Sequence, residues 1–115
     1  MILERAAITV RDGEQEAFEA AFATARQLLD RSPGCASVQL VRGIETPTSY
    51  LLLVVWHRLE DHLDGFRNSP DFGQWRGLVG PFFAVPPEVE HFAFVAAAEP
   101  EGGPGGGPGP VHPPA

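Results

Sequence analysis

The sequence predicts an α+β fold of the ferredoxin-like type, with the order βαββαβ and a four-stranded antiparallel sheet covered on one face by two helices. Two observations predict it. Segments with helical spacing of apolar residues alternate with strand-like segments along the chain. The run from Tyr50 to Trp56 is apolar at every position, as expected for a central strand whose two faces are both buried.

The first half of the chain reads as strand, helix and strand. Ile2 to Val10 alternates in part and ends at Asp12-Gly13, a turn and helix-entry signal. Ser32-Pro33-Gly34 then ends a helix, and Ala36 to Arg42 alternates as a half-buried strand. The helix is predicted from an apolar stripe at positions i, i+4, i+7 and i+11: Phe18, Phe22, Ala25 and Leu29.

The second half reads as strand, two short helical pieces and a last strand. After the apolar strand, Leu59, Leu63 and Phe66 predict a short helix. Ser69-Pro70 restarts a second piece, with Ser as the capping residue and Pro at the first helical position. This piece carries Phe72, Trp75 and Val79 on its apolar side, ends at Gly80-Pro81, and precedes a strand predicted over Val89 to Val95.

The apolar strand also predicts a partner. In the predicted fold the helices cover one face of the sheet and leave the other bare, yet Leu51 to Val55 is apolar on both sides. An identical sheet from a second subunit, packed face to face, would cover the bare face. We therefore expect a homodimer.

Composition sets the limits of the domain and its surroundings. Of the seventeen residues from Glu99 to Ala115, twelve are Gly or Pro, so we predict one folded domain over 1–98 and a disordered tail over 99–115. The net charge of −7 argues against nucleic acid as a partner. No signal peptide or membrane-length apolar run is evident, which predicts a cytoplasmic protein without a membrane partner.

Several short motifs resemble the antibiotic biosynthesis monooxygenase domains of the dimeric α/β-barrel superfamily. The resemblance covers roughly Ile2 to Phe94 and rests on the order and spacing of five pieces. These are Pro33-Gly34, the strand ending in Trp56, the helix His62 to Phe66, Ser69-Pro70-x-Phe72-x-x-Trp75, and Val89-Glu90-His91-Phe92. Membership would imply a dimeric α/β barrel with an apolar pocket in each subunit.

The resemblance implies cofactor-independent oxygenation of a small aromatic substrate by O₂, such as a phenolic polyketide converted to a quinone. Deprotonating a phenol gives an anion that can itself reduce O₂, so the protein need supply only a dry pocket, a base and orientation. Matched by position to substrate-contacting residues of quinone-forming relatives, Trp56, His62 and Arg76 are the catalytic candidates. Those relatives carry Asn where this chain has Leu52.

The remaining candidates and alternatives concern the walls of the pocket. We predict that substrate is contacted by Phe66, Phe72, Trp75 and His91, although an aromatic residue at such positions can equally be core. Arg76 occupies the axial-His position of the haem-degrading branch, and no metal-ligand spacing is present, so neither a cofactor nor a metal is predicted. A non-catalytic ligand-binding module, and a cyclase or isomerase on the same scaffold, stay open as alternatives.

Overall fold

The elements follow the predicted βαββαβ order, which is confirmed. The structure is a computed structural model that describes residues 1–96, so the predicted end of the domain at Ala98 and the predicted tail 99–115 lie outside the described residues. The elements are β1 (Ile2–Thr9), α1 (Gln15–Asp30), β2 (Cys35–Arg42), β3 (Ser49–Trp56), η1 (Asp61–Phe66), α2 (Pro70–Val79), η2 (Gly80–Phe82) and β4 (Glu88–Ala93).

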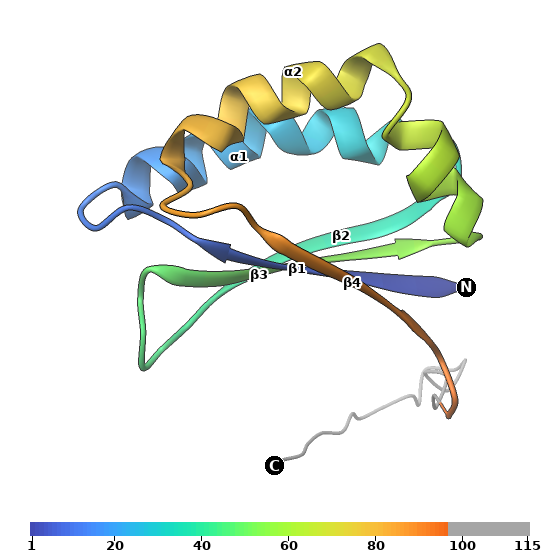
Figure 1. Cartoon of the computed structure of the whole chain (residues 1–115), viewed down its shortest axis with the longest axis horizontal. Helices are drawn as coiled ribbons and strands as arrows, with labels where there is room; N and C mark the ends of the chain where they lie inside the picture. The colour runs from blue at the N-terminus through green and yellow to red at the C-terminus, as the bar shows by residue number, and fades with distance from the viewer. Residues whose placement is uncertain (97–115) are drawn as a thin grey trace, which may run out of the picture.

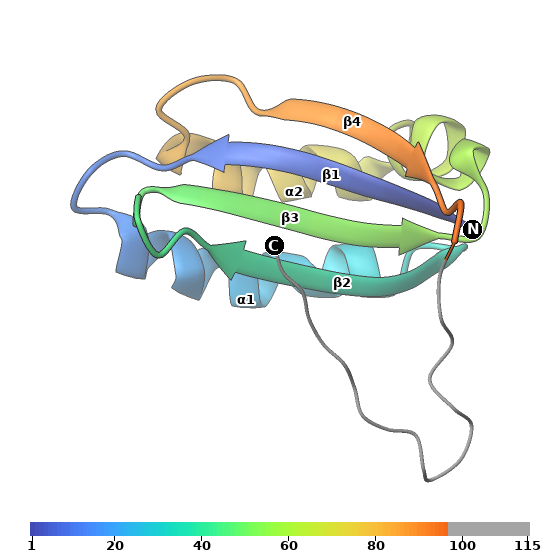
Figure 2. The ribbon, with the colours of Figure 1, turned by 90° about the horizontal axis from the view of Figure 1, so that it is seen from below.

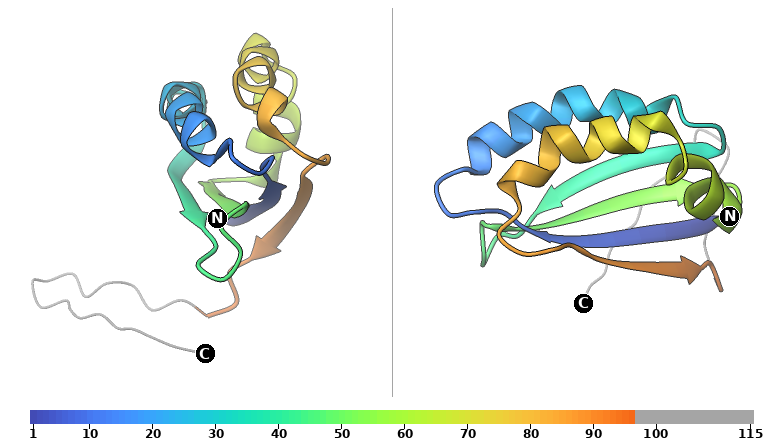
Figure 3. Two further views of the ribbon diagram at one scale, coloured as in Figure 1. Left: turned by 90° about the vertical axis from the view of Figure 1, so that its left-hand side faces the viewer. Right: turned by 45° about the horizontal axis from the view of Figure 1, so that its top comes forward.

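The four strands form one antiparallel sheet in the order β2-β3-β1-β4. Figure 1 shows α1 and α2 side by side on one face of this sheet. Seen from the opposite side, the strands lie in front and carry no helix within residues 1–96 (Figure 2). The end-on view shows α1 above the β2 side of the sheet and α2 above the β4 side (Figure 3). The predicted two-layer α+β fold is thus confirmed.

Strand β3 divides its side chains between the two faces of the sheet. Tyr50, Leu52, Val54 and Trp56 are buried beneath the helices. The alternate residues Leu51, Leu53 and Val55 point to the open face and are half-buried in the single chain. The apolar run therefore serves two surfaces, because successive side chains of a strand point in opposite directions.

The core joins α1 to both the sheet and α2. Phe18 on α1 packs edge-on against Tyr50 of β3 with ring centroids 4.9 Å apart. Phe22 meets Trp75 of α2 in a similar T-shaped contact at 5.9 Å. Burying each such large apolar side chain contributes about 1.5–3 kcal/mol before entropic costs. The predicted stripe on α1 is buried, as expected: Phe18, Phe22, Ala25 and Leu29.

Two local features differ from the predicted elements. The side chain of Ser69 does not cap α2; its Oγ donates a hydrogen bond to the carbonyl of Phe66 at 2.7 Å, while Pro70 occupies the first turn as predicted. Strand β4 ends at Ala93 rather than Val95, because Ala93 pairs with Ile2, the first residue of β1.

In the part of the chain that the structure describes, no helix has the length and apolar character needed to cross a membrane.

The segment η1 is helical as predicted, but it is a π-helix. The backbone N–H of Arg67 donates to the carbonyl of His62 at 3.0 Å, five residues back instead of four. Gly34 makes room for the start of η1, because a Cβ at this position would collide with the Asp61 side chain. Gly34 also has a φ of +88°, which other residues rarely adopt. The turn before β2 and the start of η1 are therefore packed against each other.

Candidate active site

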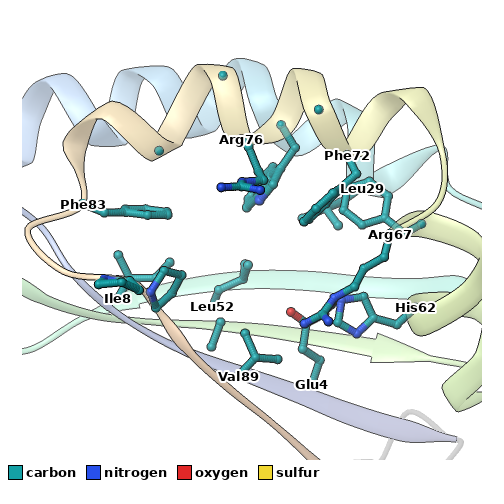
Figure 4. Close-up of a pocket in the computed structure, with 18 of the residues that line it drawn as sticks. Glu4, Ile8, Leu29, Leu52, His62, Arg67, Phe72, Arg76, Phe83 and Val89 are labelled. Atoms are coloured by element: carbon teal, nitrogen blue, oxygen red, sulfur yellow. Dashed lines mark ion pairs between the residues drawn. The ribbon is translucent and has the colours of Figure 1, made fainter.

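A pocket of about 910 Å³ lies between the helix-covered face of the sheet and α2. Its floor is apolar and comes from three strands: Ala6 and Ile8 of β1, Leu52 of β3 and Val89 of β4. Its roof is formed by α2, which presents Phe72, Trp75 and Arg76, and the segment from Gly80 to Pro87 contributes Phe83 to one end (Figure 4). A cavity of this size and lining is suited to a flat, largely apolar ligand.

A buried carboxyl lies at the other end of the pocket. Glu4 is on β1, in register with Val54 and His91, and its residue exposure is only 5%. The indole Nε1 of Trp56 donates a hydrogen bond to Oε1 of Glu4 at 2.9 Å. Glu4 also lines the pocket, and Figure 4 shows its side chain rising from the sheet toward the open space.

His62 lies against this carboxyl and is itself buried, with 4% exposure. Its ring stacks on that of Trp56, with centroids 5.2 Å apart and planes inclined by 15°. Its Nε2 is 3.5 Å from Oε1 of Glu4, and its Nδ1 is 2.8 Å from Nε2 of His91 on β4. Residues from β1, β3, η1 and β4 thus form one contact chain, which we call the Glu4 cluster: Glu4, Trp56, His62 and His91.

Burial shifts the titration of all three ionisable members of the Glu4 cluster. Loss of hydration raises the pKa of Glu4, an effect partly opposed by the Trp56 hydrogen bond and the charge of Arg67. Loss of hydration, followed by the nearby charge of Arg67 and by His91, lowers the pKa of His62 to about 4. The pKa of His91 is lowered for the same leading reason. His62 is therefore neutral near pH 7, and its contact with Glu4 is not an ion pair there.

Two arginines supply positive charge to the pocket. Arg67, directly after η1, extends toward Glu4 and His62 in Figure 4. Arg76 enters from α2, and its guanidinium carbon lies 5.8 Å from the centroid of the Phe72 ring, within the range of a cation–π contact. An anionic group on a ligand would therefore meet a guanidinium at either position.

The predicted site residues fall into two groups. His62, Arg76, Phe66, Phe72 and Trp75 all line the one pocket. Trp56 and His91 are not among its lining residues, and contact of these two side chains with a substrate stays a prediction. The indole is completely buried, with the stacked His62 ring on one side and Glu4 at its Nε1. His91 is hydrogen-bonded to His62 and lies opposite Glu4 in the sheet.

Glu4 and Arg67 were missed by sequence reasoning. The signal for Glu4 was present, because it occupies an inward position of the alternating strand that also contains Ala6 and Ile8. A carboxylate at such a position is rarely buried without a partner or a function. Arg67 follows the helical piece and gave no comparable signal.

Within residues 1–96, no group of three or more His, Cys, Asp or Glu side chains is arranged to hold a metal ion.

Comparison with known proteins gives consistent results. The family model described as antibiotic biosynthesis monooxygenase matches residues 1–78. The chain is 37% identical over 95 residues to the uncharacterised protein YczJ of Bacillus subtilis strain 168, covering 83% of this chain and 100% of that protein.

Solved structures show the same fold. A Bordetella bronchiseptica protein, provisionally assigned as an antibiotic biosynthesis monooxygenase, superposes with a TM-score of 0.80 and 46% identity over 83% of this chain and 97% of its own. A point mutant of SnoaB, a cofactor-independent oxygenase from Streptomyces nogalater, superposes with a TM-score of 0.73 at 21% identity, covering 84% and 94% of the two chains. At that identity the second match supports the fold alone.

Proposed function

Because this chain belongs to the antibiotic biosynthesis monooxygenase family, we propose that it is a small oxygenase that needs no bound cofactor and acts on an aromatic, polyketide-like metabolite. The observation that carries this proposal is the placement of a buried carboxyl and a neutral histidine at one end of an apolar pocket with two arginines in its wall. The name of SnoaB, a protein of the same fold, describes a cofactor-independent oxygenase.

The pocket favours a flat apolar ligand for a physical reason. Leu52, Val89 and Ile8 belong to the floor of the pocket and the ring of Phe72 to its roof. An aromatic ligand between them would be covered on both faces. Leu52 occupies the strand position at which quinone-forming relatives carry Asn, and it contributes only apolar contact. Polar recognition of the ligand therefore falls to the Glu4 cluster and the two arginines.

The proposed reaction inserts one oxygen atom from O₂ into a phenolic or enolic substrate. Removal of the hydroxyl proton leaves an anion, which transfers electrons to O₂ and forms a carbon–oxygen bond. Loss of water from the resulting hydroperoxide leaves a new carbonyl, so that one substrate and one O₂ give one quinone-type product and one water. The pocket would accelerate this sequence by excluding bulk water, orienting the ring and placing guanidinium groups near the anion.

We also propose that the chain works as a homodimer through the open face of its sheet. Leu51, Leu53 and Val55 of β3 lie on that face in a row, and Leu3 of β1 is half-buried beside Val55. Phe92 of β4, paired with Leu3, extends the apolar surface and is 45% exposed in the single chain. A second sheet packed on this surface would remove these side chains from water.

Oxygen consumption tests the proposed reaction. Purified protein is mixed with anthrone in an oxygen electrode, and the product is identified by mass after reaction in ¹⁸O₂. Enzyme-dependent uptake of one O₂ per anthraquinone, with one labelled oxygen in the product, would support the oxygenase. Binding of aromatic ligands without oxygen uptake would contradict it. Conversion of a ligand to an isomer under nitrogen would instead indicate a cyclase or isomerase.

A further inference from the structure

We infer that Glu4 is the residue that binds the ligand's hydroxyl group and accepts its proton, so that the pocket selects hydroxyaromatic ligands over aromatic ligands without an O–H. This inference deepens the proposed function and rests on the use of the same pocket for an aromatic ligand. It concerns a catalytic residue that the sequence motifs did not indicate.

The argument begins with the two oxygens of the Glu4 carboxyl. Oε1 accepts the hydrogen bond from Trp56 at 2.9 Å and lies 3.5 Å from Nε2 of His62. Among the described residues, no hydrogen bond reaches Oε2. Glu4 as a whole is only 5% exposed, and a buried carboxyl oxygen without a donor is costly, so a donor brought by a ligand would relieve that cost.

The direction of the side chain supports a ligand as that donor. Glu4 is one of the residues that line the pocket, and its carboxyl turns from β1 toward the space below α2 (Figure 4). The pocket is walled near it by apolar side chains such as Ala6 and Leu52. A hydroxyl on the edge of an aromatic ring would reach the carboxyl while the ring contacts the apolar floor.

His62 is less suited to accept this proton, although its residue type suggested that role. Both of its ring nitrogens face other side chains: Nδ1 is hydrogen-bonded to His91, and Nε2 faces Glu4. In one consistent arrangement His91 donates from Nε2 to Nδ1 of His62, and His62 directs its Nε2–H toward Glu4. Burial also lowers the pKa of His62 to about 4, which makes it a poor proton acceptor at neutral pH. His62 and His91 are then positioning residues for Glu4.

The charges around Glu4 are compatible with proton acceptance. Trp56 faces it from β3, His62 from η1, His91 from β4, Arg67 from the segment after η1, and Arg76 lines the same pocket from α2. In the step itself the ligand O–H bond breaks, the proton forms a new bond to Oε2, and the ligand oxygen keeps the electron pair. The total charge of the pocket is unchanged, and the arginines attract the anion that forms.

A binding experiment tests the inference without requiring turnover. The full chain is titrated with 2-naphthol and, separately, with 2-methoxynaphthalene, which has the same ring but no O–H; quenching of tryptophan fluorescence reports binding. We expect 2-naphthol to bind roughly tenfold to a hundredfold more tightly, the usual range for a hydrogen bond to a charged group. In Glu4→Gln, Oε1 can still accept from Trp56 but the other atom becomes a donor, so the preference should disappear. Glu45→Gln, an exposed loop position with the same change of charge, should keep it.

The wild-type protein provides a second measurement that does not depend on a folded variant. As the pH falls through the raised pKa of Glu4, the affinity for 2-naphthol should decrease, whereas the affinity for 2-methoxynaphthalene should not. Equal affinity of wild-type protein for the two ligands, or a preference that persists in folded Glu4→Gln, would overturn the inference whatever the oxygen electrode shows. A preference that depends on Glu4 without any oxygen uptake would overturn only the proposed reaction.

If the protein consumes oxygen, kinetics separates proton acceptance from binding alone. Glu4→Gln should lower kcat by roughly 10² or more, as expected for loss of a general base. The acidic limb of the pH–rate profile should disappear with it. In His62→Gln that limb should remain, because the base is still present. Loss of the limb in His62→Gln and its retention in Glu4→Gln would assign the proton acceptor to His62 instead.

Discussion

Nδ1 of His62 and Nε2 of His91 lie 2.8 Å apart, which joins the π-helix η1 to the strand β4 at the end of the pocket. Only one of these nitrogens can carry the shared proton when both rings are neutral. Both rings are held neutral near pH 7 by burial, so the pair forms one directed hydrogen bond rather than a repelling pair of cations.

This pairing predicts that folding stability depends on pH. A histidine whose folded pKa lies below its unfolded value binds fewer protons in the folded state, so stability is complete above about pH 6.5 and falls as the pH decreases toward 4. For His62 the loss over this interval is on the order of 2–3 kcal/mol. Glu4 acts in the opposite sense, because its raised pKa favours proton binding by the folded state.

Denaturant unfolding between pH 4 and 7 measures both contributions. As the pH decreases, the free energy of unfolding of His62→Gln should fall less than that of the wild type. The free energy of unfolding of Glu4→Gln should fall more steeply than that of the wild type. The same change in slope for both variants would contradict the assigned pKa directions.

Replacing Trp56 by Phe tests the hydrogen bond to Glu4. The substitution keeps an aromatic ring in the core but removes the donor from a buried carboxyl oxygen, so we expect a loss of about 1–3 kcal/mol in the free energy of unfolding. The pKa of Glu4 should rise further, because the Trp56 hydrogen bond lowers it in the wild type. Trp75→Phe, also a buried tryptophan at 8% exposure, is the matched control and should cost less if the hydrogen bond to Glu4 matters.

Replacing Arg76 by Gln tests the recognition of negative charge. We expect the variant to bind 2-naphthoate roughly twofold to fivefold more weakly, the range for a partly exposed ion pair, with no change for neutral 2-methoxynaphthalene. Arg76→Lys should show part of the loss, since an ammonium group cannot form the two parallel hydrogen bonds of a guanidinium. Arg42→Gln serves as control, because Arg42 pairs with Glu19 away from the pocket. Equal weakening by both variants would show a general effect of net charge.

Replacing Val55 by Asp tests the proposed homodimer. Val55 is on the open face, so the variant should stay folded but form monomers, which light scattering at micromolar concentration detects. Val54 faces the helices and is completely buried, so Val54→Asp should instead unfold the chain. Ile44→Asp, at a loop residue that is 90% exposed, should leave the oligomeric state unchanged. A folded wild-type monomer at micromolar concentration would rule out the dimer.

The fold could be predicted because each element carried a local signal. Tyr50 to Trp56 identified the central strand from its composition, and Pro70 marked the start of α2. The site was predicted less completely, because its key contacts join residues far apart in sequence. Trp56 and Glu4 are 52 positions apart, and nothing in either segment alone shows that the indole donates to the carboxyl.

The motif-based candidates also differ in how well their surroundings could be foreseen. His62 was a candidate from its motif position, and the structure buries it, with its ring stacked on Trp56 of β3 and hydrogen-bonded to His91 of β4. Burial of a histidine depends on how the helix is rotated, and the sequence pattern of so short a helix does not specify the rotation. Arg76 was simpler, because α2, which carries it, lies over the sheet and forms the roof of the pocket.

The π-helix η1 places one more residue between His62 and Arg67 than an α-helical turn needs. The N–H of Arg67 donates to the carbonyl of His62, five residues back instead of four. A π-helical turn of this kind corresponds to an α-helical turn with one residue added. A chain shortened by one residue within this turn, for example at Gly65, would close it with an α-helical hydrogen bond and leave the two flanking residues close to their present directions. Among homologues, a one-residue alignment gap at this place is therefore compatible with the same pocket.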